Sequence, residues 1–147
     1  MSKVVLLKES SYDEQRVFDG VCLAVEKLGG MDKWVKKGEK ILIKPNLLSP
    51  EAPEKAITTH PTLVKAVIRL VQQAGASAYI GDSPSLASLK RAASKSGLER
   101  VAEDTGADLL QFEESREMPA QPKNIFKKLE IAREVLEMDG IINLPKL

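Results

Sequence analysis

The sequence has very little cysteine, few aromatic residues and no excess of either charge. Cys22 is the only cysteine among 147 residues, so a disulfide within the chain and a cysteine-ligated metal cluster are both excluded. Aromatic residues make up 4%, too few for the stacking platforms that bind single-stranded nucleic acid. The 22 basic and 21 acidic residues give a net charge of +1, which provides no general attraction to nucleic acid. We therefore expect a reducing compartment and no nucleic-acid partner.

Long apolar runs are also absent. The first ten residues, MSKVVLLKES, hold an apolar run that is too short for a signal peptide or a membrane span. We therefore expect a cytoplasmic protein that does not enter a membrane. The chain ends on DGIINLPKL, which has the pattern of a buried strand and its exit loop. Because domains usually end at solvated positions, we expect residues 1–147 to form a single α/β domain at the N-terminus of a longer protein.

Apolar residues recur at helical and at strand spacing along the chain. Helices are predicted over Tyr12–Leu28, Pro61–Ala74, Ser85–Ser96 and Leu98–Thr105, with helical turns at 31–37 and 133–138. Strands are predicted over Val4–Leu7, Lys40–Lys44, Ser77–Ile80, Asp108–Phe112 and Gly140–Leu144. Loops are predicted over 46–59 and 113–123, and 124–132 fits either a strand or a helix. Strands that alternate with helices favour a mostly parallel sheet with helices on both faces, a Rossmann-like three-layer α/β sandwich.

Polar residues follow the predicted strands at the point where each strand ends. The candidates for binding a small anion are, in chain order, Lys44, Asn46, Thr59, Gly81, Ser83, Asn143 and Lys146. Two further residues, His60 and Asp82, are candidates for moving a proton. Because ligands bind beyond the carboxyl ends of the strands in an open parallel sheet, we expect these side chains to surround one crevice. No metal ligands are assigned, and the residues indicate no substrate, reaction or cofactor, so enzymatic activity stays open.

Each candidate also has a plainer structural explanation. The threonines before Pro61 fit the cap of a helix, and a lone histidine there is as readily structural. The segment GDSPS either cradles an anion on the amides of the next helix or forms a tight turn, and it matches no nucleotide-binding fingerprint. Asp82 binds a cation, orients a base or caps a helix. Lys44 and Lys146 either bind an anion or are solvated.

Four segments in order, ILIKPNLLSP, TTHPTLVKAVIRLVQQAGA, YIGDSPS and DGIINLPKL, resemble the successive motifs of domain-of-unknown-function family 362. The resemblance extends from residue 3 to residue 147. It implies an α/β domain of a larger, redox-linked protein, because many members carry ferredoxin-like iron–sulfur segments. It also implies two partners, the missing C-terminal segment and a ferredoxin-like protein. The single cysteine of this chain cannot hold a four-cysteine cluster itself.

Two functions are consistent with these observations. One is an enzyme part with a small anionic ligand or a metal at the strand ends. The other is a non-catalytic module that docks to the missing C-terminal part or to a redox partner.

Overall fold

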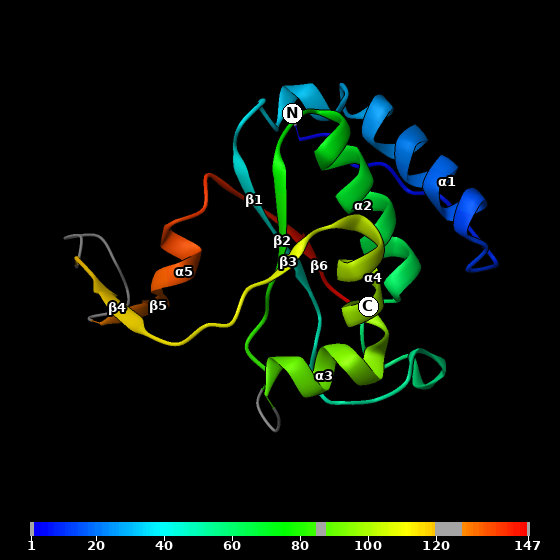
Figure 1. Cartoon of the computed structure of the whole chain (residues 1–147). Helices are drawn as coiled ribbons and strands as arrows, with labels where there is room; N and C mark the ends of the chain where they lie inside the picture. Colours follow the sequence, from blue (N-terminus) through cyan, green and yellow to red (C-terminus); the bar gives the residue numbers. More distant parts are fainter. Residues whose placement is uncertain (1, 85–87, 120–127, 147) are drawn as a thin grey trace.

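A four-stranded parallel sheet forms the centre of the fold (Figure 1). The computed structural model describes residues 2–84, 88–119 and 128–146. Across the sheet the strand order is β3-β2-β1-β6. The strands are β1 (Lys40–Pro45), β2 (Ser77–Ile80), β3 (Asp108–Leu109) and β6 (Gly140–Leu144). Because every neighbouring pair is parallel, the four strands end at the same edge, which we call the carboxyl edge.

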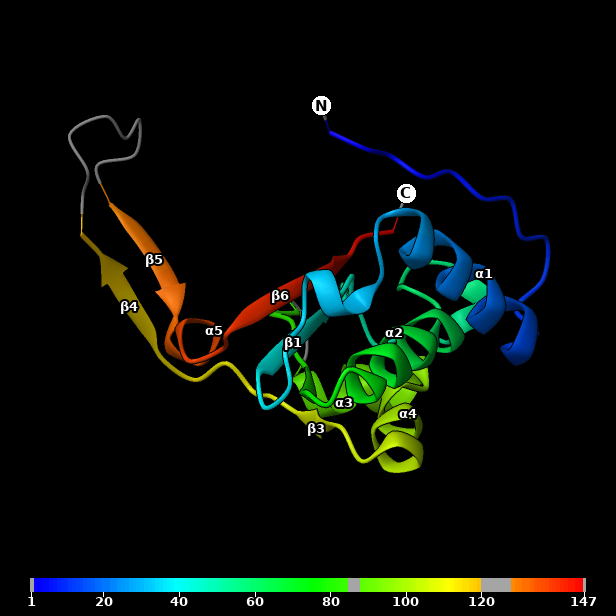
Figure 2. The same cartoon turned by 90° about the horizontal axis from the view of Figure 1, so that it is seen from above.

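The longer helices lie on one side of this sheet. Figure 2 shows α1, α2 and α4 on that side, while the one-turn helix α5 and an antiparallel hairpin lie on the opposite side. The helices are α1 (Glu14–Lys27), α2 (Pro61–Gln73), α3 (Leu89–Ser96), α4 (Leu98–Thr105) and α5 (Arg133–Leu136). The hairpin strands are β4 (Ser115–Met118) and β5 (Leu129–Ala132), and short 3-10 helices occupy Met31–Lys33 and Pro53–Lys55. The expected α/β class, a parallel sheet flanked by helices in a Rossmann-like sandwich, is confirmed.

Side chains of β1 alternate between the two faces of the sheet. Ile41 and Ile43 are buried in the core that α2 covers. Leu42 points to the opposite face and is also buried. Its register partner on β6, Ile141, is 51% exposed. The helix-covered face is therefore a filled core, whereas the opposite face is covered only in part.

The local sequence explains where the helices begin and end. Pro61 occupies the first turn of α2, where a missing N–H removes no helical hydrogen bond. Gly97 alone joins α3 to α4, and its φ of +79° lies in the left-handed region that glycine adopts readily. The chain changes direction at this single residue, and α4 packs on both α3 and α2.

The predicted elements agree with the structure over most of the chain. Ser77–Ile80 and Gly140–Leu144 are strands and Leu98–Thr105 is a helix, as predicted. α3 begins at Leu89 with Ser88 as its N-cap. Residues 85–87 of that predicted helix lie outside the described residues.

Two predictions are wrong. Val4–Leu7 forms no strand with any described residue, because a strand needs a partner as well as apolar side chains. The predicted loop 113–123 contains β4, which pairs with β5 in antiparallel register. Pro119 follows β4 instead of interrupting it, so the backbone donors of the strand are intact. Residues 120–127 lie outside the described residues.

Candidate functional site

Asp82 connects the ends of β1 and β2 at the carboxyl edge. Its Oδ1 lies 2.7 Å from Lys44 Nζ, and its Oδ2 accepts a hydrogen bond from the Leu47 amide at 2.8 Å. The Asp82 side chain is 11% exposed, whereas the Lys44 side chain is 41% exposed. Asp82 therefore holds the Lys44 ammonium in place at the edge. A lysine ammonium has three N–H donors, so Lys44 retains the capacity to bind a ligand.

Thr59 ties together the chain segments that leave β1 and β6. Its hydroxyl accepts from the Asn46 amide at 2.9 Å and donates to the Leu144 carbonyl oxygen at 2.6 Å. The Thr59 amide in turn donates to the Asn46 carbonyl oxygen at 3.2 Å. Thr59 is buried, and its hydroxyl both accepts and donates a hydrogen bond. The residue therefore holds these two segments together.

His60 is the N-cap of α2. Its Nδ1 accepts a hydrogen bond from the Thr62 amide at 3.3 Å, and its ring stacks on Tyr12 with the centroids 3.6 Å apart. Burial lowers the pKa of His60, the positive charge of Lys146 lowers it further, and Glu54 opposes both. The neutral form with its proton on Nε2 is therefore favoured, because Nδ1 acts as an acceptor. The cap is this ring and not the preceding threonines.

Asn143 lies beside Lys44 on the sheet. The two residues are register partners between β6 and β1, so their side chains share the face opposite the helices. Asn143 is exposed. Lys146 follows β6 close enough to His60 for its charge to act on the imidazole. Asn46 instead uses its side-chain amide within the chain, where Nδ2 donates to the Ile57 carbonyl oxygen at 3.2 Å.

Gly81 allows close packing inside the protein. A Cβ at this position would lie 3.0 Å from side-chain atoms of Leu42 and Phe112 and 3.1 Å from the Leu110 carbonyl oxygen. The sequence predicted that Gly81 leaves room for a ligand beside the backbone. That room is instead filled by other residues of the chain. Ser83 is exposed. It lines a separate cavity that none of the other candidates lines.

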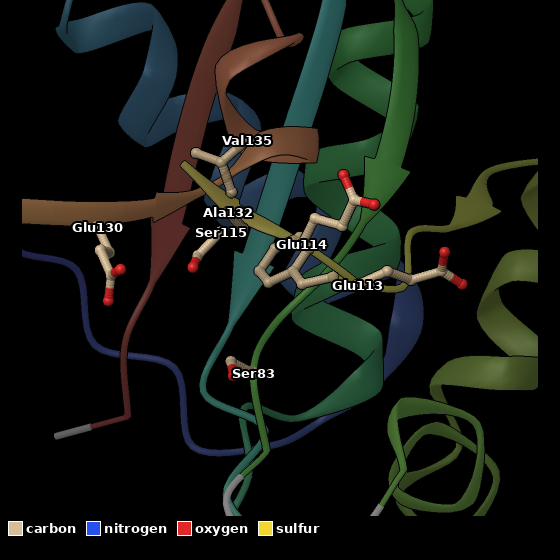
Figure 3. A pocket seen from close by; sticks show the side chains of 8 residues that line it. Ser83, Glu113, Glu114, Ser115, Glu130, Ala132 and Val135 are labelled. Atoms are coloured by element: carbon tan, nitrogen blue, oxygen red, sulfur yellow. The ribbon is translucent and has the colours of Figure 1, made fainter. Parts of the chain in front are cut away.

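That cavity has a volume of about 490 Å³ and is acidic. Figure 3 shows Ser83 on one side of it and residues of the hairpin and α5 on the other. Its lining consists of Ser83, Phe112, Glu113, Glu114, Ser115, Glu130, Ala132 and Val135. Part of the charge is compensated, because Glu114 pairs with Arg133 at 3.0 Å and Glu130 pairs with Lys128 at 3.0 Å. The sequence contained no local signal for this cavity, since the hairpin that closes it depends on pairing between segments.

The structure therefore brings most of the predicted residues together. Hydrogen bonds, an ion pair or strand register link Lys44, Asn46, Thr59, Gly81, Asp82 and Asn143 at the ends of β1, β2 and β6. His60 and Lys146 lie beside this group, and Ser83 does not belong to it. Sequence reasoning missed two participants, the Leu47 amide and the Leu144 carbonyl, because backbone groups carry no side-chain signal.

The described residues show no arrangement suited to a metal. Among them, no group of three or more His, Cys, Asp or Glu side chains could hold an ion. Cys22 is half-buried on α1, and burial raises the pKa of its thiol. An iron–sulfur cluster, which needs several thiolates, does not fit the residues of this chain. No helix within the described ranges has the length and apolar character needed to cross a membrane.

Comparison with known proteins gives the family. Residues 41–147 match the model described as "Domain of unknown function (DUF362)". The chain belongs to this family. The DUF362 match begins at Ile41, the second residue of β1, so it is narrower than the resemblance traced from residue 3.

A curated relative of this DUF362 chain is the thylakoid-associated protein sll1697 of Synechocystis sp.. It is 34% identical over 147 residues, which cover 100% of this chain and 45% of the relative. The chain thus spans less than half the length of that protein. No solved structure matches the chain.

Proposed function

We propose that this DUF362 domain binds a small anionic ligand, such as a carboxylate or a phosphate, at the carboxyl edge of its sheet. Lys44, Asn143 and Lys146 would supply the hydrogen-bond donors. The observation that carries the proposal is the placement of Lys44 and Asn143 as neighbours on one face, with the ammonium held by Asp82. A positioned donor loses less conformational entropy on binding than a mobile one.

The balance of charge at this edge supports an anion. Asp82 is the carboxylate that contacts Lys44, and each of its oxygens already has a partner. Lys146 adds a second positive charge beside His60, and Glu54 partly offsets it. The Asn143 amide adds a neutral donor beside Lys44, and together these groups match the acceptor oxygens of a carboxylate or phosphate.

A catalytic role for His60 and Asp82 stays a prediction. Asp82 is bonded to Lys44 and to the Leu47 amide, and His60 caps α2 through Nδ1. Both residues therefore act here by positioning other groups. His60 retains one ring nitrogen, Nε2, through which it could exchange a proton with a ligand at the edge.

The proposal is tested by titrating the chain with inorganic phosphate and with acetate at constant ionic strength, followed by amide NMR shifts. Lys44→Gln removes the charge but can still donate to Asp82, so the fold should persist. Lys40→Gln is the matched control, because Lys40 begins the same strand at the opposite edge. We expect Lys44→Gln and Asn143→Ala to weaken binding and Lys40→Gln to leave it unchanged. Equal affinities for all variants, or shifts confined to other surfaces, would contradict the site.

A second candidate function is a docking module. The chain spans 45% of the length of its Synechocystis relative, and the sheet face opposite the helices exposes Ile141, with Leu129 and Leu136 exposed in the adjoining hairpin and α5. Parallel sheets are normally covered on both faces, so further chain from a longer protein would fit there. Hydrogen exchange in the full-length relative and in its matched region alone would test this. Slower exchange of the β6 equivalent in the full-length protein is expected.

The cellular setting is also a proposal. We propose a cytoplasmic location and a ferredoxin-like redox partner, and the name of the Synechocystis relative adds an association with thylakoids. Fractionation of cells that express the chain, followed by detection in soluble and membrane fractions, distinguishes these settings.

A further inference from the structure

The N-terminal residues Val4–Leu7 are apolar, belong to no helix or strand, and pair with no described strand. Val4 is 88% exposed and Leu6 is 93% exposed. Four consecutive apolar residues are typical of a strand buried on both faces of a parallel sheet. Burial of such a segment removes apolar side chains on both of its sides from water, which is favourable.

The outer edge of β6 offers a place. No described strand lies beyond β6 in the sheet, and its residue Ile141 is half exposed. An apolar cavity of about 220 Å³ lies between the N-terminal segment and the first two helices. Its lining includes Leu7, Val17, Val21, Ala24 and Leu63. Leu7 thus lines the same cavity as residues of α1 and α2, the helices beneath which a strand beyond β6 would lie.

The topology fits a strand at this edge. The step from β1 through α2 to β2 runs along the sheet with the helix on the side that α1 also occupies (Figure 2). A strand beyond β6, followed by α1 and β1, would step in the same direction along the same side. The two connections would then have the same hand, as parallel crossovers require. The connection from β3 to β6 runs in the opposite direction and carries its hairpin and α5 on the opposite side, which satisfies the same rule.

Tyr12 fixes the direction of the segment. Its ring stacks on His60, the N-cap of α2, at the carboxyl edge of the sheet. A strand over Val4–Leu7 would therefore run toward this edge, parallel to β6, and residues 8–11 would form its exit loop. Six or so residues of extended chain span at most about 20 Å, so the exit loop must reach the start of α1 within that distance.

We propose that Val4–Leu7, which pairs with no described strand in this structure, can dock on the outer edge of β6 as a fifth parallel strand of the sheet. Val5 and Leu7 would face the helices, consistent with the half-buried state of Val5 and the place of Leu7 in the cavity wall. Val4 and Leu6 would lie on the opposite face beside Ile141. The docked strand would cover the free edge of β6, which otherwise is a site for pairing with other chains. This inference is independent of the proposed anion site.

Amide hydrogen exchange of the whole chain, measured residue by residue by NMR, tests the docking. Docking predicts that alternate amides of Val4–Leu7 exchange at least tenfold more slowly than in an unstructured peptide. Leu6→Asn should abolish that protection and lower the thermal unfolding midpoint by several degrees. The matched control is Leu48→Asn, because Leu48 is also an exposed leucine outside the helices and strands, and it should have little effect.

Two results would overturn the proposal. Exchange of all four amides at unstructured rates, with equal midpoints for Leu6→Asn and Leu48→Asn, would mean that the segment is a free tail. Protection that appears only in a dimer, as judged by light scattering across a dilution series, would assign the edge to the segment of a second copy.

Discussion

At the scale of single residues, two adjacent buried threonines have opposite hydrogen-bond status. Thr59 is 1% exposed and its hydroxyl joins Asn46 to Leu144. Thr58 is 2% exposed, and its hydroxyl has no partner among the described residues. Valine has nearly the shape of threonine but lacks the hydroxyl. Thr59→Val should therefore lower the free energy of unfolding by about 1–3 kcal/mol, because a buried donor and acceptor lose their partner.

Thr58→Val serves as the matched comparison in the same urea-unfolding experiment. Removal of an unpartnered buried hydroxyl should leave the free energy of unfolding unchanged or raise it. Equal losses for the two variants would show that Thr59 does not act as a link between the strand exits.

His60 predicts a dependence of stability on pH. Burial, and then Lys146, lower its pKa from 6.5 in the folded protein, so the unfolded chain binds a proton more readily. The contribution of neutral His60 to the free energy of unfolding is therefore fully present above pH 6.5, and it is lost as the pH falls through the pKa of the folded protein. His60→Asn keeps an N-cap acceptor and should remove this loss. Glu9, Glu134 and Asp104, whose pKa values are also lowered, have ordinary values of 4.5 or below and respond at lower pH.

The measurement is simple because His60 is the only histidine. Its ring protons should titrate below 6.5 in NMR spectra of the folded chain. A midpoint at or above 6.5, or an unchanged stability profile in His60→Asn, would contradict the burial of this ring.

At the scale of elements, the exit of β2 depends on the absence of a side chain at Gly81. A Cβ there would meet Leu42, Phe112 and the backbone oxygen of Leu110 at 3.0–3.1 Å. Gly81→Ala should therefore cost about 1–3 kcal/mol of unfolding free energy, as overpacking typically does. Gly140→Ala should cost less, because its Cβ would meet only the movable end of Ile41 at 3.2 Å. Thermal or urea unfolding of the two variants measures this difference. A larger loss of unfolding free energy for Gly140→Ala would contradict the tight packing around Gly81.

Elements were predictable where their own residues determine them. The apolar spacing of α2 and the proline in its first turn give its bounds to within one residue. β4 was missed because Ser115–Met118 has no alternating pattern and exists through its register with β5. Val4–Leu7 is the opposite case. Its apolar residues favour a strand, but the local sequence does not determine which strand it could pair with.

At the scale of the whole molecule, the meeting of the candidate residues at one edge could be predicted, but the contacts between them could not. Parallel strands must end at one edge, so polar residues after β1, β2 and β6 had to meet. The bond from Thr59 to Leu144 spans 85 positions and the bond from Leu47 to Asp82 spans 35. Such long-range pairs depend on the packed fold, so the sequence named Thr59 and Asp82 without showing that they position other groups.

The charge balance of the whole chain leads to a last prediction. With 22 basic and 21 acidic residues, any affinity for anions must come from a local arrangement such as the one around Lys44, not from the overall field. Long polyanions need many phosphate or sulfate contacts and lose affinity steeply with salt. The chain should therefore pass through a heparin column at about 0.15 M salt, where the Debye length is about 8 Å, while phosphate still shifts the amides near Lys44. Retention on heparin well above that salt concentration would show instead that the lysines form a general polyanion-binding surface.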